Sequence, residues 1–220
     1  IYGCGYEFKE IMWDAAPDWP DKVLIYTSVA ETPPATLTNV AAIVQQDQES
    51  GFIAGIIAGL MTETNKIGLV LAENAPSCNS YAHGVQYGLN LTNPTAQLLV
   101  VYAGSWVDPA KGSDVVLGFA NLGVDIVTAY ADATGIGGMK AADEKGIKWI
   151  GVYLNQSVVG PATCVAYASY DWDEPLGRIY QEAAKGAFKG PLVVRMGVAE
   201  GYIKFVSTNN MPEDVKLAVE

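Results

Sequence analysis

The sequence predicts an α/β protein built on doubly wound parallel sheets, and three features of the middle of the chain predict it. Short apolar runs at 98–103, 124–129 and 147–153 alternate with segments of helical periodicity. Gly123 and Gly146 follow those segments, at the place where a left-handed residue commonly ends a helix. Helical connections between strands imply parallel pairing with right-handed crossovers, so we expect a parallel sheet here.

Each helix of this stretch has an N-terminal signal. Asp108-Pro109 opens the first, because aspartate caps free backbone N–H groups and proline is tolerated in the first turn. Asp132 opens the second. Ligands of parallel sheets bind beyond the carboxyl ends of the strands. Those ends carry an aromatic and hydrogen-bonding set without a paired acid and base: Trp106, Tyr130, Asp132, Tyr153 and Asn155.

The rest of the chain shows a similar alternation. Before the central stretch, the patterns predict helices over 7–16, from a cap at Ser50 or Asp47 to about 64, and over about 75–91. They predict strands over 22–28, 38–45 and 66–72. After it, they predict a strand over 163–169, a helix over 173–188, two strands or a hairpin over 191–198 and 201–206, and a helix from 211. The apolar run 51–61 is far shorter than the ~20 residues that span a bilayer. Its small residues indicate close packing of a buried helix.

We expect the chain to form two lobes. The middle of the chain completes a doubly wound domain, whereas residues 1–45 supply only half of one. The strand and helix over 163–190 suit this incomplete domain. The sequence therefore predicts an incomplete N-terminal lobe over residues 1–45 and 158–190, and a C-terminal lobe over residues 46–157 and 191–220.

Composition limits the classes of function. The formal net charge is −11, from 13 basic and 24 acidic residues, and such a surface disfavours nucleic acid and anionic membrane surfaces as partners. The three cysteines form no Cys-x-x-Cys pair and His83 is the single histidine, so we expect no metal site. Cys78 and Cys164 could form a disulfide in an oxidising compartment or remain buried thiols.

Catalytic and cofactor signals are weak. The run Gly135-Ile136-Gly137-Gly138 superficially suggests a dinucleotide fingerprint, but the third glycine at the needed spacing is missing. No segment resembles a nucleophile elbow, and one histidine leaves little for general-base chemistry. We therefore expect no cofactor and no enzymatic activity.

Five segments together resemble one family of proteins. In chain order they read IYGCGYEF, QESGFIAGIIAGLMTETNKIGLV, YAGSWVDPAKG, GVDIVTAYADATGIGG and IGVYLNQ. They are similar to the basic membrane protein family, of the Med/PnrA type, of ABC-transporter substrate-binding lipoproteins. The likeness covers nearly the whole chain, and its most discriminating parts are SWVDPAKG and GVDIV with ATGIGG.

The resemblance implies a type I periplasmic-binding-protein fold, in which two Rossmann-like lobes with parallel sheets close on a small ligand. That ligand is usually a purine nucleoside, held in the interlobe cleft and delivered to the permease subunits of an ABC importer. The implied location is extracytoplasmic, at the cell surface or in the periplasm, with a lipid anchor outside this chain. The family has about one more strand-helix-strand unit before the position of Ile1. A ligand-sensing regulatory domain and a nucleoside-modifying enzyme are the alternatives.

The family's ligand contacts carry over only in part. Its strand aromatic falls at Thr128, and Tyr130 on the same strand face is expected to stack instead. Its ribose-binding aspartate maps to Tyr153 or Asn155, so the charged acceptor is gone. Its lysine maps near Trp172. The predicted ligand-binding residues are Tyr6, Glu49, Trp106, Tyr130, Asp132, Asn155 and Trp172.

Several of these residues also have structural interpretations. Trp106 could line the cleft or pack between lobes, and Tyr130 and Asp132 could contact the ligand or only shape the turn before a helix. Glu49 could act in helix capping or as part of a hinge. Asp108 is expected to be an N-cap rather than a ligand group.

Overall fold

A computed structural model describes residues 1–28 and 32–219 of the chain. The chain folds into two compact units, each of which combines separate stretches of sequence. The first unit comprises Ile1–Asp47 and Asp171–Ile203, and the second comprises Gln48–Tyr170 and the segment from Lys204 onward.

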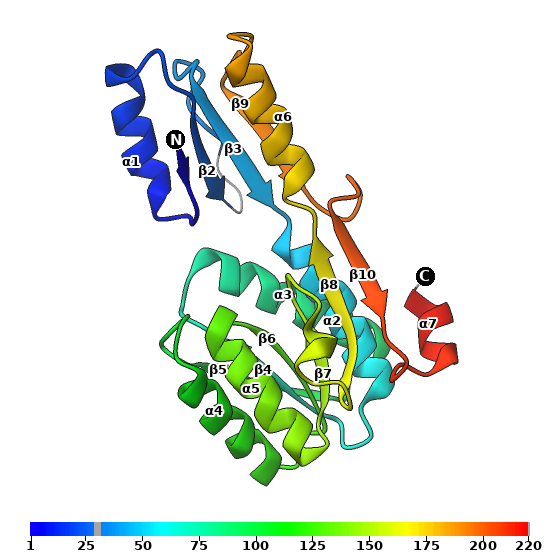
Figure 1. Cartoon of the computed structure of the whole chain (residues 1–220). Helices are drawn as coiled ribbons and strands as arrows, with labels where there is room; N and C mark the ends of the chain where they lie inside the picture. The colour runs from blue at the N-terminus through cyan, green and yellow to red at the C-terminus, as the bar shows by residue number, and fades with distance from the viewer. Residues whose placement is uncertain (29–31, 220) are drawn as a thin grey trace. The chain divides into compact units, whose positions relative to one another are not determined.

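The first unit has a four-stranded sheet in the order β1-β2-β3-β9. Its elements are β1 (Tyr2–Gly3), α1 (Phe8–Ala15), a 3₁₀ turn (Ala16–Asp18), β2 (Leu24–Ser28), β3 (Val40–Gln45), α6 (Asp173–Ala184) and β9 (Leu192–Met196). All neighbouring strands pair in parallel. Helices α1 and α6 lie on opposite sides of the strands (Figure 1). Met12, Tyr26 and Val44 belong to one buried cluster between α1 and the sheet.

The second unit has a six-stranded sheet in the order β10-β8-β7-β6-β4-β5. Its strands are β4 (Lys66–Leu71), β5 (Gln97–Tyr102), β6 (Ile126–Tyr130), β7 (Lys148–Gly151), β8 (Cys164–Tyr170) and β10 (Ile203–Ser207). Its helices are α2 (Asp47–Met61), α3 (Pro76–Thr92), α4 (Pro109–Asn121), α5 (Asp132–Lys145) and α7 (Glu213–Val219), with a 3₁₀ turn at Gln156–Val158. Strands β5, β4, β6, β7 and β8 pair in parallel. The predicted α/β architecture with parallel sheets is confirmed.

Two strands belong to sheets other than those predicted. Strand β8 pairs with β7 in the second unit, with Gly151 opposite Tyr167, although residues 158–190 were assigned to the N-terminal lobe. Strand β9 pairs with β3 in the first unit, although residues 191–220 were assigned to the C-terminal lobe. Strands β9 and β10 lie in different sheets and form no hairpin. The apolar pattern that predicts a strand is the same in either sheet, and only tertiary pairing selects the partner.

Helices α2 and α3 approach so closely that glycine is required at their contact. A Cβ on Gly55 would lie 2.1 Å from the carbonyl oxygen of Val85, and a Cβ on Gly88 would lie 2.0 Å from that of Phe52. Any larger residue would force the helices apart. The close packing predicted for residues 51–61 is therefore confirmed.

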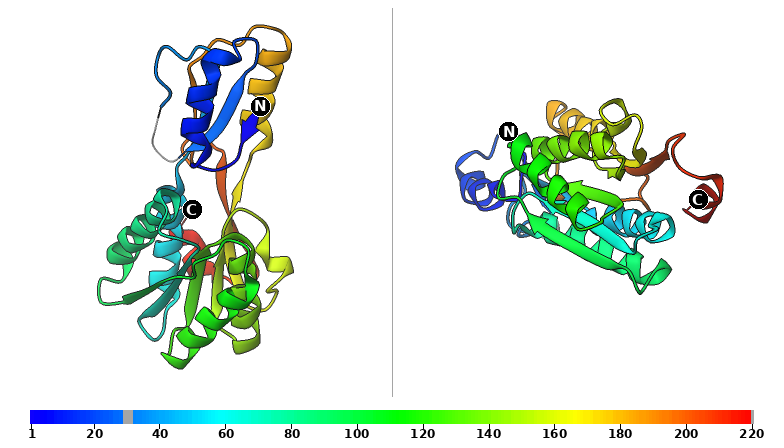
Figure 2. Two further views of the ribbon diagram at one scale, coloured as in Figure 1. Left: turned by 90° about the vertical axis from the view of Figure 1, so that its left-hand side faces the viewer. Right: turned by 90° about the horizontal axis from the view of Figure 1, so that it is seen from below.

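Helices α4 and α5, on the other face of the sheet, also approach each other closely through glycines (Figure 2). A Cβ on Gly137 would lie 2.0 Å from the carbonyl oxygen of Pro109, and a Cβ on Gly112 would lie 1.8 Å from that of Thr134. The glycine run that superficially suggested a dinucleotide fingerprint thus packs on α4.

Two cysteines are buried in the second unit as thiols. Cys78 Sγ donates to the carbonyl oxygen of Tyr130 at 3.8 Å, and Cys164 Sγ donates to that of Ala166 at 3.5 Å. Burial raises the pKa of Cys164 to about 12, so this thiol stays protonated at neutral pH. Of the two alternatives predicted for these residues, the structure shows buried thiols.

Among the described residues, none of the helices combines the length and the apolar character required to cross a membrane.

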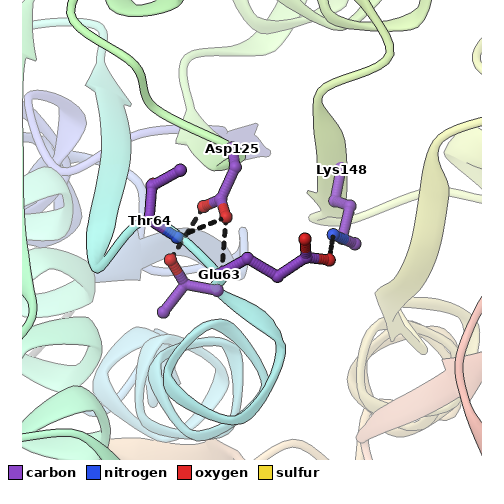
Figure 3. A network of polar contacts seen from close by, with 5 residues as sticks. Glu63, Thr64, Asp125 and Lys148 are labelled. Atoms are coloured by element: carbon purple, nitrogen blue, oxygen red, sulfur yellow. Dashed lines mark hydrogen bonds and ion pairs between the residues drawn. The ribbon is translucent and has the colours of Figure 1, made fainter.

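The amino end of the six-stranded sheet carries a polar network (Figure 3). Asp125, directly before β6, accepts hydrogen bonds from Thr62 Oγ1 at 2.8 Å and from the backbone N–H groups of Glu63 at 2.6 Å and Thr64 at 2.9 Å. Lys148, the first residue of β7, forms an ion pair with Glu63 at 3.1 Å. This network fixes the turn between α2 and β4 against two neighbouring strands.

Candidate functional site

The carboxyl end of the six-stranded sheet gathers aromatic side chains. Strand β6 ends at Tyr130 and β8 ends at Tyr170, while Tyr153 follows β7 and Trp106 follows β5. Because these strands are parallel, their carboxyl ends meet at one edge of the sheet. Together with Tyr81 from α3, these side chains form what we call the aromatic cluster: Tyr81, Trp106, Tyr130, Tyr153 and Tyr170.

Tyr130 lies at the centre of the aromatic cluster. Its ring centroid is 5.2 Å from that of Tyr81, 5.3 Å from that of Tyr153, and 6.1 Å from that of Trp106, which meets it edge-on at 72°. Tyr153 in turn lies 4.5 Å from Tyr170. Aromatic pairs at such separations contribute about 0.5–1.5 kcal/mol beyond the area they bury, so the cluster is a preorganised set of rings.

The phenol groups of the cluster form hydrogen bonds with one another and with nearby hydroxyls. Tyr130 and Tyr153 share a hydrogen bond between their hydroxyls, and Tyr170 shares one with Ser50 Oγ at 2.7 Å. Thr128 Oγ1 donates to the carbonyl oxygen of Ile150 at 3.0 Å.

The donor in the hydrogen bond between Tyr81 and Thr128 follows from the protons that are available. The two hydroxyl oxygens are 2.6 Å apart. The single proton of Thr128 is used on Ile150, so Tyr81 donates to Thr128. The hydroxyl of Thr128 on β6 therefore anchors a ring that comes from α3.

Exposure divides the cluster into two parts. Tyr81 is 0% exposed, Tyr130 is 2% exposed and Tyr170 is 7% exposed. Trp106 and Tyr153 are only half-buried. Within the second unit, Trp106 and Tyr153 therefore offer the ring surface that a bound molecule can touch. The buried ring of Tyr130 packs against both of their rings.

The backbone around the cluster adopts an unusual conformation at two residues. Tyr153 has φ of 71° and Asp132 has φ of 42°; Asn65 is the other residue besides glycine with a left-handed φ in the part of the chain that the structure describes. Non-glycine residues held in sparsely populated backbone conformations cluster at functional sites, at a cost of about 1–3 kcal/mol each. Partial desolvation raises the pKa of the Asp132 carboxyl above its usual value.

Five of the predicted site residues belong to the second unit. Trp106 and Tyr130 are in ring contact, and Asp132 follows Tyr130 at the start of α5. Glu49 is half-buried in the first turn of α2. Asn155 Oδ1 accepts from the backbone N–H of Ser157 at 3.1 Å and from its hydroxyl at 2.6 Å, and so caps a 3₁₀ turn.

Two predicted residues belong to the first unit. Tyr6 is exposed in the turn before α1, and Trp172 is half-buried at the start of α6. Asp108, by contrast, accepts from the backbone N–H groups of Ala110 at 3.1 Å and Lys111 at 3.3 Å, so its predicted role as an N-cap is confirmed.

Sequence reasoning passed over Tyr81, Tyr170 and Ser50. Tyr170 directly follows the predicted strand 163–169, so a strand-end rule applied to that strand would have found it. Tyr81 lies on the buried face of α3 and has no local signal that separates it from an ordinary core residue.

The cluster presents groups that are suited to binding. Its aromatic rings can stack on a flat molecule, and its hydroxyls can exchange hydrogen bonds with one. Among the residues that the structure describes, no group of three or more histidine, cysteine, aspartate or glutamate side chains is placed to hold a metal ion.

Comparison with known proteins gives a match over almost the whole chain. A family model described as "ABC transporter substrate-binding protein PnrA-like" matches residues 1–219. A purine-binding protein of Brucella abortus (strain 2308) is 27% identical over 188 residues, covering 84% of this chain and 52% of that protein. Basic membrane protein A1 of Borrelia garinii subsp. bavariensis is 26% identical, covering 96% of this chain and 64% of that protein. The chain thus spans between half and two thirds of the length of these relatives.

Solved structures share the fold. An ABC transporter solute-binding protein from Aeropyrum pernix K1 superposes with a TM-score of 0.82 at 22% identity, covering 99% of this chain and 67% of that one. A structure titled as a transcriptional activator of the comK gene from Bacillus halodurans gives a TM-score of 0.81 at 18% identity, covering 100% of this chain and 75% of that one. At such identities the likeness shows the fold alone.

Proposed function

Because the chain belongs to the PnrA-like family of ABC-transporter substrate-binding proteins, we propose that it captures a purine nucleoside or a closely related purine outside the cytoplasmic membrane for an ABC importer. The name of the Brucella relative, a purine-binding protein, supports the class of ligand. The permease subunits are the proposed partners, and a lipid anchor outside this chain is the proposed attachment to the membrane.

The aromatic cluster is the observation that carries the proposal. Trp106 and Tyr153 are its half-buried members, and the buried Tyr130 supports both of them. Stacking of a base on an aromatic side chain contributes about 1–3 kcal/mol. Two such contacts would supply a large share of the ~8 kcal/mol that corresponds to a micromolar dissociation constant.

Charge favours an uncharged ligand. The chain carries a net charge of −11, from 13 basic and 24 acidic residues. A nucleotide would bring its phosphate into the field of this net negative charge. We therefore propose a nucleoside or base rather than a nucleotide, and we propose that the ligand is released chemically unchanged.

Four of the remaining predicted residues extend this proposal. Asp132 and Asn155 are proposed to hydrogen-bond the polar atoms of the ligand from the second unit. Tyr6 and Trp172 are proposed as aromatic contacts from the first unit. A regulatory role on the same fold stays an alternative that no observation specifically favours.

Isothermal titration calorimetry with the 220-residue chain tests the proposal. Adenosine, guanosine, inosine and hypoxanthine are the probes, and AMP and glucose are the controls. We expect at least one neutral purine to bind with micromolar or better affinity and to stabilise the protein by about 2.7 kcal/mol at 100 times its dissociation constant. AMP should bind at least tenfold more weakly than adenosine. Chromatography after incubation should recover the purine intact. Absence of binding by every purine would refute the proposed ligand class.

A further inference from the structure

The loop that carries Trp106 is anchored on its upstream side to Ala72, the residue that follows strand β4. The backbone N–H groups of Gly104 and Ser105 donate to the carbonyl oxygen of Ala72 at 2.8 and 3.1 Å. Gly104 has φ of 71°, so the chain turns sharply there. These bonds fix where the loop leaves β5 but leave the residues beyond Ser105 to be held by other contacts.

Thr134 supplies three hydrogen bonds to this loop, besides the one from the Val107 backbone N–H to Ser105 Oγ at 3.1 Å. It is fully buried in the first turn of α5. Its hydroxyl donates to the carbonyl oxygen of Ser105 at 2.9 Å and accepts the backbone N–H of Asp108 at 2.9 Å. Its own backbone N–H donates to the carbonyl oxygen of Trp106 at 3.1 Å. One residue therefore bonds the loop before, at and after Trp106.

Helices α4 and α5, which flank the loop, pack closely against each other beside Thr134. The closest approach of α4 to α5 puts Gly112 against the backbone of Thr134, and Gly137 against the backbone of Pro109. Thr134 also follows Tyr130 by only four residues, on the connection from β6 into α5. The bonds of Thr134 thus join the segment that carries Trp106 to the segment that carries Tyr130.

We propose that Thr134 is a positioning residue that sets the edge-on contact of Trp106 with Tyr130 and so presents the indole to the ligand. This inference rests on the proposed function in that Trp106 is taken to contact the purine. Only a hydroxyl can donate and accept at once in this position, so serine can replace threonine whereas the isosteric valine cannot. Thr134→Val would leave the carbonyl of Ser105 and the N–H of Asp108 without this partner.

The experiment uses the 220-residue chain labelled with 5-fluorotryptophan. The ¹⁹F resonance of Trp106 is assigned by its loss in Trp106→Phe. We expect Thr134→Val to shift or broaden the Trp106 resonance and to weaken the affinity for the tightest-binding purine by about tenfold, the factor that corresponds to 1.4 kcal/mol. Thr134→Ser should restore both the resonance and the affinity. Thr134→Ala, which adds no bulk, replaces Thr134→Val if the latter does not fold.

Thr208 offers a matched control in the same unit. Its hydroxyl also donates to a carbonyl oxygen, that of Cys164 at 2.6 Å, and accepts a backbone N–H, that of Asn210 at 3.1 Å. Thr208→Val therefore removes a similar bridge and should leave the Trp106 resonance and the purine affinity unchanged.

Three results would overturn the inference. The first is a Trp106 resonance that is identical in Thr134→Val and the unsubstituted chain. The second is a Thr134→Ser variant that behaves like Thr134→Val. The third is an equal response to Thr208→Val. If the unsubstituted chain binds no purine, the proposed function fails, but the ¹⁹F spectra of the ligand-free protein still decide whether Thr134 positions Trp106.

Discussion

At the amino end of the six-stranded sheet, Asp125 accepts three hydrogen bonds and Lys148 pairs with Glu63, whereas the carboxyl end is built from rings. Both ends contain a residue with a left-handed φ, but the residue types differ. At the amino end it is Asn65, a type that tolerates this conformation. At the carboxyl end, besides Asp132, it is Tyr153, a bulky residue that does not tolerate this conformation.

This difference in residue types assigns different roles to the two ends of the sheet. The amino end satisfies its polar groups and stores little strain, which is the arrangement expected of a region that serves stability. The carboxyl end holds a tyrosine in a costly conformation and keeps the two half-buried rings, Trp106 and Tyr153, at the same place. We therefore expect substitutions at the two ends to separate stability from binding.

The largest effect is expected at the amino end, for Asp125→Ala. Loss of three hydrogen bonds to a carboxylate should lower the free energy of unfolding by about 2–4 kcal/mol. Purine affinity should stay within about twofold, which is under 0.5 kcal/mol. Urea denaturation measures the first quantity and calorimetry the second. Asp114→Ala, at an exposed position of α4, controls for the change in charge. A loss of stability no larger than that of Asp114→Ala would contradict the stabilising role of the Asp125 hydrogen bonds.

The second effect is expected at the carboxyl end, for Trp106→Ala. Removal of a stacking surface worth about 1–3 kcal/mol should weaken purine binding by roughly 5- to 150-fold. Trp106→Phe should recover part of the affinity, because it restores a ring. Trp19→Ala removes a tryptophan that is 50% exposed in the first unit and serves as the control. An affinity equal to that of the unsubstituted chain would remove Trp106 from the site.

The third test uses pH at Asp132. Desolvation raises the pKa of this carboxyl in the folded state above the usual value of 3.8, so the folded protein holds the proton more tightly than the unfolded chain does. Stability due to this group is therefore full below pH 3.8 and falls as pH rises through the folded-state pKa.

Asp132→Asn should remove the loss of stability that ionisation of Asp132 causes. Asparagine also tolerates the left-handed φ of 42° at this position. Relative to the unsubstituted chain, the variant should gain stability as pH rises from below 3.8 toward neutrality. Thermal unfolding over this pH range measures the gain, with Asp114→Asn as the control. A difference that stays constant with pH would show that Asp132 titrates alike in both states.

The smallest effect is expected for the ion pair of Lys148 with Glu63. The Lys148 side chain is 31% exposed and that of Glu63 is 83% exposed, so water and salt screen the attraction. Lys148→Met should lower the free energy of unfolding by only about 0.2–1 kcal/mol, and less in high salt. A loss comparable to that of Asp125→Ala would mean that the ion pair stabilises this end as much as the hydrogen bonds of Asp125 do.

Local sequence determined the alternation of strands and helices and some of their ends. The Asp108-Pro109 start of α4 and the left-handed Gly146 at the end of α5 depend on residues a few positions apart, and both are found as predicted. The small residues of α2 predicted close packing because only small side chains permit it. The resemblance to the PnrA-like family, which was visible in short motifs, is confirmed by the match over residues 1–219.

Tertiary structure alone decided which sheet each outer strand joins and which rings meet. Strands β8 and β9 carry the same kind of apolar pattern, yet one pairs with β7 and the other with β3. Tyr81 and Tyr170 reach Tyr130 and Tyr153 from elements far apart in the sequence. Short-range patterns report burial and backbone preference, whereas strand partners and ring contacts depend on chain segments that meet only when the whole sheet assembles.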